Sequence, residues 1–177
     1  MYPNRHQPQK EAQPLMPPNK VTTPLVVLAS LLVAMVLRIL PWPVEWFVYN
    51  PDWMLLILIY WAMAIPDRVG VGYAWCVGLL GDVLTGRMLG QHALAYSVVI
   101  FICVKWHVRF RTYPVYQQTL FVLMLLLLNQ VLIFLTQNNK AASSIGIVYW
   151  LPPFVGALLW PAILPALRQV RWHFHIS

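Results

Sequence analysis

Charged side chains are scarce in this sequence. Asp, Glu, Lys and Arg together make up 10% of the 177 residues, and only 5 residues are acidic. Hydrophobic residues make up 60% and the mean hydropathy is +0.64, far more than a soluble domain needs to fill its core. This composition excludes a soluble globular fold, and the long apolar runs predict an all-α polytopic membrane protein.

Cysteines and catalytic motifs are also scarce or absent. Cys76 and Cys103 lie in apolar stretches without CxxC or CxxH spacing, so we expect them to pack as small hydrophobic residues. The sequence has no GxSxG, HExxH or GxxxxGK motif and no pair of carboxylates within one apolar segment. His173 and His175 lie in the short basic tail, where they could bind a metal only weakly and nonspecifically. For His92, His173 and His175, no second His, Cys or carboxylate of an apolar segment stands at metal-ligand spacing. We therefore predict a protein that is not an enzyme and binds no metal or cofactor.

Basic residues outnumber acidic ones and give a net charge of +7. A DNA-binding surface would gather this charge on one water-exposed face, whereas here the basic residues are scattered beside apolar segments. We therefore expect no nucleic-acid partner. The better explanation is membrane topology, because Lys and Arg are retained on the cytoplasmic side of inserted helices.

Apolar segments along the chain predict a bundle of about six transmembrane helices. The first covers 21–40 and is long enough, at about 1.5 Å per residue, to cross a hydrocarbon core of about 30 Å. The second is short unless it begins near Phe47. The remaining boundaries are approximate, and the second to sixth helices are expected at 53–66, from 69 onward, and at 89–106, 115–136 and 145–167.

The chain divides into a tail at 1–20, a transmembrane helical domain at 21–168 and a short basic tail at 169–177. The first tail is rich in Pro, Gln and Asn, which predicts a disordered segment and not a cleavable signal peptide. With this tail inside, the cytoplasmic segments hold nine Lys and Arg residues, whereas the outside loops hold only Arg87 and Lys140. We therefore expect both termini to be cytoplasmic.

A basic hairpin separates the fourth and fifth predicted helices, and it contains Lys105, Arg109 and Arg111. We expect this hairpin to face the cytoplasm, where it fixes the topology and contacts anionic lipid. Each basic residue near such a surface contributes about 1 kcal/mol. Contact with a cytoplasmic filament is the alternative.

Small residues recur every four positions in the stretch GVGYAWCVGLLGDVLTGRMLG, at 70–90. We call these positions the ladder, which consists of Gly70, Ala74, Gly78, Asp82, Gly86 and Gly90. Small residues at this spacing form a groove that lets another helix, of this chain or of a partner, approach closely. A straight helix drifts by about 40° with each four-residue step, so six positions cannot share one face. We therefore expect close packing from Gly70 to Asp82 and a turn through Gly86 and Gly90.

Asp82 is an acidic residue within an apolar segment, where a carboxylate is costly without a partner, a cavity or water. Arg38 falls late in the first predicted helix, at a similar depth, which predicts an ion pair between Arg38 and Asp82. The alternative is that Arg38 reaches the outer headgroups and that Asp82 caps a kink or meets interfacial water. A proton relay is a third interpretation, but no second acid lies at this depth within a predicted helix.

Three other polar residues lie in or beside predicted helices. Asn129 and Gln130 in the fifth predict hydrogen bonds between helices, with contact to a substrate as the alternative. His92 follows Gly90 at the start of the fourth helix, where we expect it to cap the helix at the membrane interface.

Several motifs resemble those of the MreD family, rod shape-determining membrane proteins of Gram-negative bacteria. The resemblance extends from about residue 25 to the C-terminus, so it assigns no role to the Pro-rich tail. The most specific motifs are PWP at 41–43, the spaced Pro, Trp, LLIL and YW at 51–61, PDRVGVG at 66–72, GLLGDVLTGRMLG at 78–90 and GALLWPAILPALRQVR at 156–171.

The resemblance implies a non-enzymatic scaffold of the cell-elongation machinery in the bacterial inner membrane. Proteins of this family associate with MreC and, with it, link MreB filaments to the peptidoglycan synthases RodA and penicillin-binding protein 2. The expected partners are thus MreC, this rod complex and membrane lipids, with a homo-oligomer as a further option.

The resemblance also implies a fold similar to the six-span substrate-binding subunits of energy-coupling-factor transporters. A transporter subunit that binds a lipid or a small solute is therefore the alternative function, although fold alone does not determine function. The apolar segments show no cluster of polar residues that would line a solute site. This absence favours the scaffold.

Overall fold

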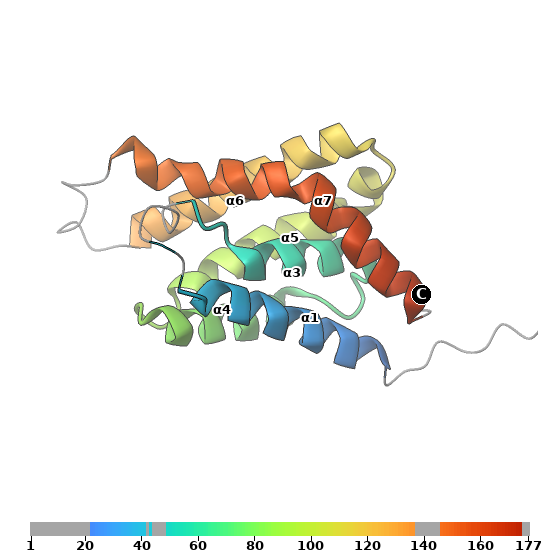
Figure 1. Cartoon of the computed structure of the whole chain (residues 1–177), viewed down its shortest axis with the longest axis horizontal. Helices are drawn as coiled ribbons and strands as arrows, with labels where there is room; N and C mark the ends of the chain where they lie inside the picture. The colour runs from blue at the N-terminus through green and yellow to red at the C-terminus, as the bar shows by residue number, and fades with distance from the viewer. Residues whose placement is uncertain (1–21, 42, 44–48, 137–145, 175–177) are drawn as a thin grey trace, which may run out of the picture.

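The computed structural model describes residues 22–41, 43, 49–136 and 146–174 (Figure 1). The predicted tail at 1–20 lies outside these residues, as do Lys140 and His175. Of the described residues, 83% are helical and none is in a strand, which confirms the all-α prediction.

Six α-helices and one short 3₁₀ helix make up the described chain. The α-helices coincide with the six predicted apolar segments, although several bounds differ by a few residues. The elements are α1 (Thr22–Ile39), α3 (Trp53–Ala64), α4 (Val71–Thr85), α5 (Gln91–Arg111), α6 (Val115–Thr136), the 3₁₀ helix η2 (Ile147–Trp150) and α7 (Leu151–His173).

The helices fall into two classes of length. Four stretches are long and apolar enough to cross a membrane, namely α1, α5, α6 and the segment Val148–His173 that contains α7. By contrast, α3 has 12 residues and α4 has 15. At about 1.5 Å per residue, both are shorter than a hydrocarbon core of about 30 Å. The four long helices indicate a multi-pass membrane protein, and the number of six spans stays a prediction.

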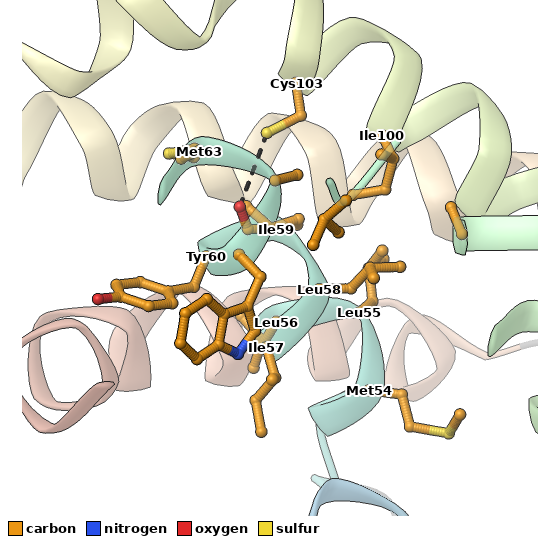
Figure 2. Close-up of a cluster of buried hydrophobic side chains, with 14 of the residues drawn as sticks. Met54, Leu55, Leu56, Ile57, Leu58, Ile59, Tyr60, Met63, Ile100 and Cys103 are labelled. Atoms are coloured by element: carbon orange, nitrogen blue, oxygen red, sulfur yellow. Dashed lines mark hydrogen bonds between the residues drawn. The ribbon is translucent and has the colours of Figure 1, made fainter. Parts of the chain in front are cut away.

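The short helix α3 lies at the centre of the bundle, where it contacts α1, α4, α5 and α7 (Figure 1). Its sequence, WMLLILIYWAMA, has no charged residue, and ten of its 12 residues are buried. A helix that is apolar on every side is stable where apolar groups cover all its faces. Side chains of α5, including Ile100 and Cys103, cover one of them (Figure 2).

Two side-chain hydrogen bonds connect α3 to its neighbours. Trp61 Nε1 donates to Ser30 Oγ of α1 at 2.8 Å. The Cys103 thiol of α5 donates to the Ile59 carbonyl at 3.8 Å (Figure 2). Cys103 is thus packed in the core as predicted, whereas Cys76 of α4 is exposed, so the prediction for Cys76 is wrong.

The helices α4 and α5 pack against each other along part of the ladder. Gly78 lies so close to α5 that a β-carbon there would come within 2.6 Å of the Ala93 backbone nitrogen. Ala74 and Asp82 have no exposed surface. Gly70 differs, because it precedes α4 at a place where a β-carbon would meet nothing within 4 Å. The close contact at Gly78 is therefore with α5 of the same chain.

The chain turns between α4 and α5 at the two glycines where the four-residue spacing predicts a turn. The helix α4 ends at Thr85 and α5 begins at Gln91. Gly86 and Gly90 have φ angles of 61° and 99°, a region that residues with a side chain rarely adopt. Glycine is thus required at both positions by the backbone, and not by packing.

The substitution Gly78→Ala should destabilise the bundle, because the added methyl group would collide with the backbone of α5. Overpacking of this kind costs about 1–3 kcal/mol. We expect a lower midpoint of thermal unfolding for the purified protein in detergent. The matched control Gly72→Ala adds the same group where nothing lies within 4 Å, and it should leave the midpoint unchanged or slightly raised. Equal midpoints for the two variants would contradict the close packing.

Candidate functional site

Asp82 is buried in the last turns of α4 and reaches across the turn to the start of α5. Its Oδ2 accepts a hydrogen bond from the Gly90 amide and its Oδ1 accepts one from the His92 amide, both at 2.8 Å. The first amide groups of a helix lack partners within the helix and carry partial positive charge. Asp82 therefore caps α5 from the neighbouring helix.

His92 supplies a third partner for the same carboxylate. Its Nδ1 lies 2.7 Å from Asp82 Oδ1, and its side chain is 2% exposed. A carboxylate removed from water is tolerated only where several donors surround it, and here two amides and a ring nitrogen do so. The His92 ring thus bonds to Asp82 and not to an amide of α5, so the prediction that His92 caps α5 is wrong, whereas its place at the membrane interface stays a prediction.

Asp52 forms a second polar contact at this end of the bundle. It precedes α3, and its Oδ1 accepts a hydrogen bond from the Leu55 amide at 3.3 Å, which caps that helix. The Tyr96 hydroxyl of α5 lies 2.7 Å from both carboxylate oxygens. Arg38 Nη1, near the end of α1, lies 3.9 Å from Oδ1. Asp52 therefore connects α1, α3 and α5.

Arg38 and Asp82 thus have different partners, and the predicted ion pair between them is replaced by two other contacts. Arg38 pairs with Asp52, and Asp82 pairs with His92. The reason is the turn after α4, which brings the amides of α5 back to Asp82. The alternative, that Asp82 caps a kink or meets interfacial water, also differs from the structure, in which Asp82 has no exposed surface and binds the first amides of α5. A signal for Asp52 was present, because an acidic residue three positions before Leu55 at the start of an apolar run is typical of a helix N-cap.

His92 and Tyr96 bring the two carboxylate sites together. They are four residues apart on α5, so their side chains share one face. Their rings lie 5.7 Å apart at an angle of 80°. We call these five residues, Arg38, Asp52, Asp82, His92 and Tyr96, the polar cluster. The sequence predicts no cluster of polar residues that would line a solute site, whereas Arg38, Asp52 and His92 of the polar cluster line a pocket.

A pocket of about 740 Å³ opens beside the polar cluster. Its lining comes from α1, α4, α5, α6 and the η2–α7 segment, and it includes Arg38, Asp52, Arg87, His92, Asn129 and Tyr149. Among the residues that the structure describes, no three His, Cys, Asp or Glu side chains could hold a metal ion. Polar side chains from several helices thus face one pocket.

Asn129 and Gln130 differ in how their amides are used. Gln130 Nε2 donates to the Tyr149 carbonyl at 2.9 Å and so connects α6 to η2, as predicted. Asn129 is 3% exposed, yet within the described part of the chain its Oδ1 has no hydrogen-bond partner. A further contact that the sequence did not indicate comes from Gln91 of α5, whose Nε2 donates to the Ile133 carbonyl at 3.0 Å.

The basic hairpin lies at the other end of α5, where Lys105, Arg109 and Arg111 are exposed. Gln118 of α6 closes the turn that follows. Its Nε2 donates to the carbonyls of Phe110 and Tyr113, at 3.1 and 3.0 Å. Arg109 Nε also donates to the Tyr113 hydroxyl at 3.2 Å, and the three basic side chains remain exposed to solvent or headgroups.

Comparison with known proteins shows the family of this chain. The family model for "rod shape-determining protein MreD" matches residues 19–170, which include the polar cluster, the pocket lining and the basic hairpin. The chain belongs to the MreD family. The rod shape-determining protein MreD of Haemophilus influenzae is 32% identical over 145 residues, which cover 82% of this chain and 90% of that protein.

A search of the solved structures found no significant match. The similarity of this MreD family member to the substrate-binding subunits of energy-coupling-factor transporters therefore stays a prediction. Membership of the MreD family implies a role in determining rod cell shape.

The substitution Asp82→Asn should loosen the start of α5. The Asn side chain keeps one acceptor oxygen, but its NH₂ group is a donor and would face the donors of Gly90 or His92. Each lost hydrogen bond to a buried charged group costs about 1.5–3 kcal/mol. We expect a lower unfolding midpoint and faster hydrogen exchange at the amides of Gly90 and His92. Asp67→Asn, at an exposed site in the turn after α3, is the matched control and should change neither quantity. Unchanged exchange in Asp82→Asn would show that the carboxylate does not hold this end of α5.

Proposed function

We propose that this chain is a non-enzymatic scaffold of the cell-elongation machinery in the bacterial inner membrane. It binds MreC and helps to couple MreB filaments to peptidoglycan synthesis by RodA and penicillin-binding protein 2, and so maintains rod shape. The observation that carries this proposal is the match to the MreD family over residues 19–170.

The use of the buried polar groups supports a scaffold. Asp52 and Asp82 cap helices, and Gln91 and Gln130 donate to backbone carbonyls of neighbouring segments. Each of these contacts fixes one helix relative to another, because an unpaired polar group in an apolar interior is unfavourable. A bundle held in this way presents a constant surface to its partners.

The distribution of charge between the two ends supports cytoplasmic termini. The C-terminal end of α7 and the turn between α5 and α6 lie on the same side of the bundle (Figure 1). Arg109 and Arg111 lie in the last turn of α5, and Arg171 lies in the last turn of α7. The other end holds the polar cluster and Arg87, so two carboxylates there accompany two arginines. The basic end is the one that the retention of Lys and Arg would keep inside.

The binding surface for MreC has to lie outside the contact between α4 and α5, because Gly78 already packs on α5. Apolar side chains are exposed on every long helix and on α4. Examples are Leu32 of α1, Val83 of α4, Leu120 of α6 and Leu158 of α7, which are 61%, 66%, 61% and 77% exposed. Such side chains face lipid or the transmembrane segment of a partner.

Loss of this protein should round a rod-shaped host, and the intact chain should restore rods and co-purify MreC. A photo-crosslinking residue placed in turn at Leu32, Val83, Leu120 and Leu158 should form a crosslink to MreC from at least one of these positions. Leu58, which has no exposed surface, is the control position and should form none. Rod cells that persist without the protein, or solute uptake that depends on it while cell shape does not, would favour the transporter function.

The proposed orientation can be tested with single cysteines at the two ends of α5, in a Cys76→Ser background that removes the exposed native thiol. An impermeant thiol reagent added to spheroplasts should label Met88→Cys, in the turn before α5, but not Arg109→Cys. Met88 is 71% exposed and Arg109 is also exposed, so both should react after lysis. Labelling of Arg109→Cys in intact spheroplasts would reverse the orientation.

A further inference from the structure

The pocket beside the polar cluster contains more positive than negative charge. Two cations, Arg38 and Arg87, line it, against the single carboxylate of Asp52. The Asp52 carboxylate is also engaged by the Tyr96 hydroxyl and the Leu55 amide. Asp82 does not line the pocket. One positive charge therefore remains without a counter-ion on the lining.

Three polar atoms of the lining have no hydrogen-bond partner among the described residues. They are Asn129 Oδ1, Arg87 Nη1 and Tyr149 Oη. The Asn129 side chain is 97% buried, since its exposed fraction is 3%, and Arg87 lies close enough to Tyr149 for its charge to act on the hydroxyl. Buried polar groups in native proteins almost always have a partner, from the protein, water or a ligand. The unpaired oxygen of the buried Asn129, on the same pocket lining as the neighbouring Arg87 guanidinium and Tyr149 hydroxyl, indicates that a ligand supplies the missing partner.

The types of these groups indicate the chemistry of the ligand. A guanidinium presents paired N–H donors that match the oxygens of a phosphate, and a tyrosine hydroxyl can donate a further hydrogen bond. The Asn129 amide can rotate to offer either its oxygen or its NH₂ group, because the two are assigned from the hydrogen bonds around them. The pocket is larger than a phosphate ion needs, and Ile39, Leu84 and Ile133 add apolar surface to it.

We infer that this pocket binds a phosphate group, carried by an anionic lipid headgroup or present as a free phosphate ion. Arg87 and Tyr149 bind the phosphate oxygens, and Asn129 donates to them or bonds to a neighbouring polar group of the ligand. Arg38 supplies long-range attraction while its guanidinium stays beside Asp52. This inference rests on the pocket alone, so it does not depend on binding of MreC.

The test uses the full-length protein purified in detergent and titrated with three probes. Native mass spectrometry would measure binding of phosphatidylglycerol and of zwitterionic phosphatidylcholine, and a thermal-shift titration would measure binding of inorganic phosphate. Saturable binding of phosphatidylglycerol in preference to phosphatidylcholine identifies a lipid headgroup. Saturable stabilisation by inorganic phosphate without preferential lipid binding identifies the free ion. The absence of saturable binding by both anionic probes would overturn the inference.

Two variants separate binding from folding. Arg87→Gln should weaken binding of the anionic probe by about tenfold or more, as expected when a hydrogen-bonded charged partner is lost. Asn129→Leu keeps the size of the side chain and removes the unpaired group. It should weaken binding while leaving the unfolding midpoint of the unliganded protein unchanged or higher, a combination that a purely structural Asn129 would not show.

Arg109→Gln is the matched control, since it removes the same charge at the exposed basic hairpin on the opposite end of α5. It should alter binding by less than about twofold, within the effect of a surface charge. Equal weakening by Arg109→Gln and Arg87→Gln would show that the anion binds by general surface attraction, and it would overturn the site.

Discussion

The carboxylate of Asp82 determines how the two helices on either side of it are arranged. With no exposed surface, it is stable only where hydrogen-bond donors surround it, and the start of α5 supplies two backbone amides and the His92 ring. This requirement fixes the start of α5 beside the end of α4. From there, Gly78 lies against Ala93, and Tyr96 falls one turn further along α5, opposite the carboxylate that caps α3. One desolvated acid thus sets the position of a helix and, through it, a second polar contact.

The helices and the turn after α4 were predictable because both depend on local patterns. Apolar runs define helical segments, and the drift of a four-residue spacing places Gly86 and Gly90 off the helix. The partners of the polar residues were not predictable, since Asp52 and Tyr96 are 44 residues apart. In a membrane protein, side chains that face lipid and side chains that face protein are equally apolar, so hydropathy does not show which helices are neighbours. The pocket beside Asn129 also depends on which helices are neighbours, so it could not be predicted from the sequence either.

The central helix α3 runs from the polar cluster toward the end of the bundle that holds the basic hairpin. Asp52 caps its first turn within the polar cluster, whereas its last turn lies toward the side of the bundle where α5 ends in Arg111 and α7 carries Arg171 in its last turn (Figure 1). Between these ends every face is covered by apolar side chains, and Trp61 is further held by Ser30 of α1. A tilt of α3 would therefore disturb its packing on all sides, the cap at Asp52 and the hydrogen bond from Trp61 to Ser30. The bundle is organised around a helix that is too short to cross the membrane alone.

The difference in helix length has a consequence for the order in which the chain can become stable during synthesis. The helix α1 emerges first, is long and apolar enough to reside in lipid by itself, and packs chiefly on α3. The helices α3 and α4 follow, and neither spans the hydrocarbon core without help. Asp82 at the end of α4 and Asp52 at the start of α3 gain their partners only when α5 has formed. That helix supplies the hydroxyl that binds Asp52, and its start supplies the amides that bind Asp82. The helices α3 and α4 are thus completed by α5, and an unfinished chain that ends before Gly90 would leave Asp82 without its amide donors and Asp52 without the Tyr96 hydroxyl.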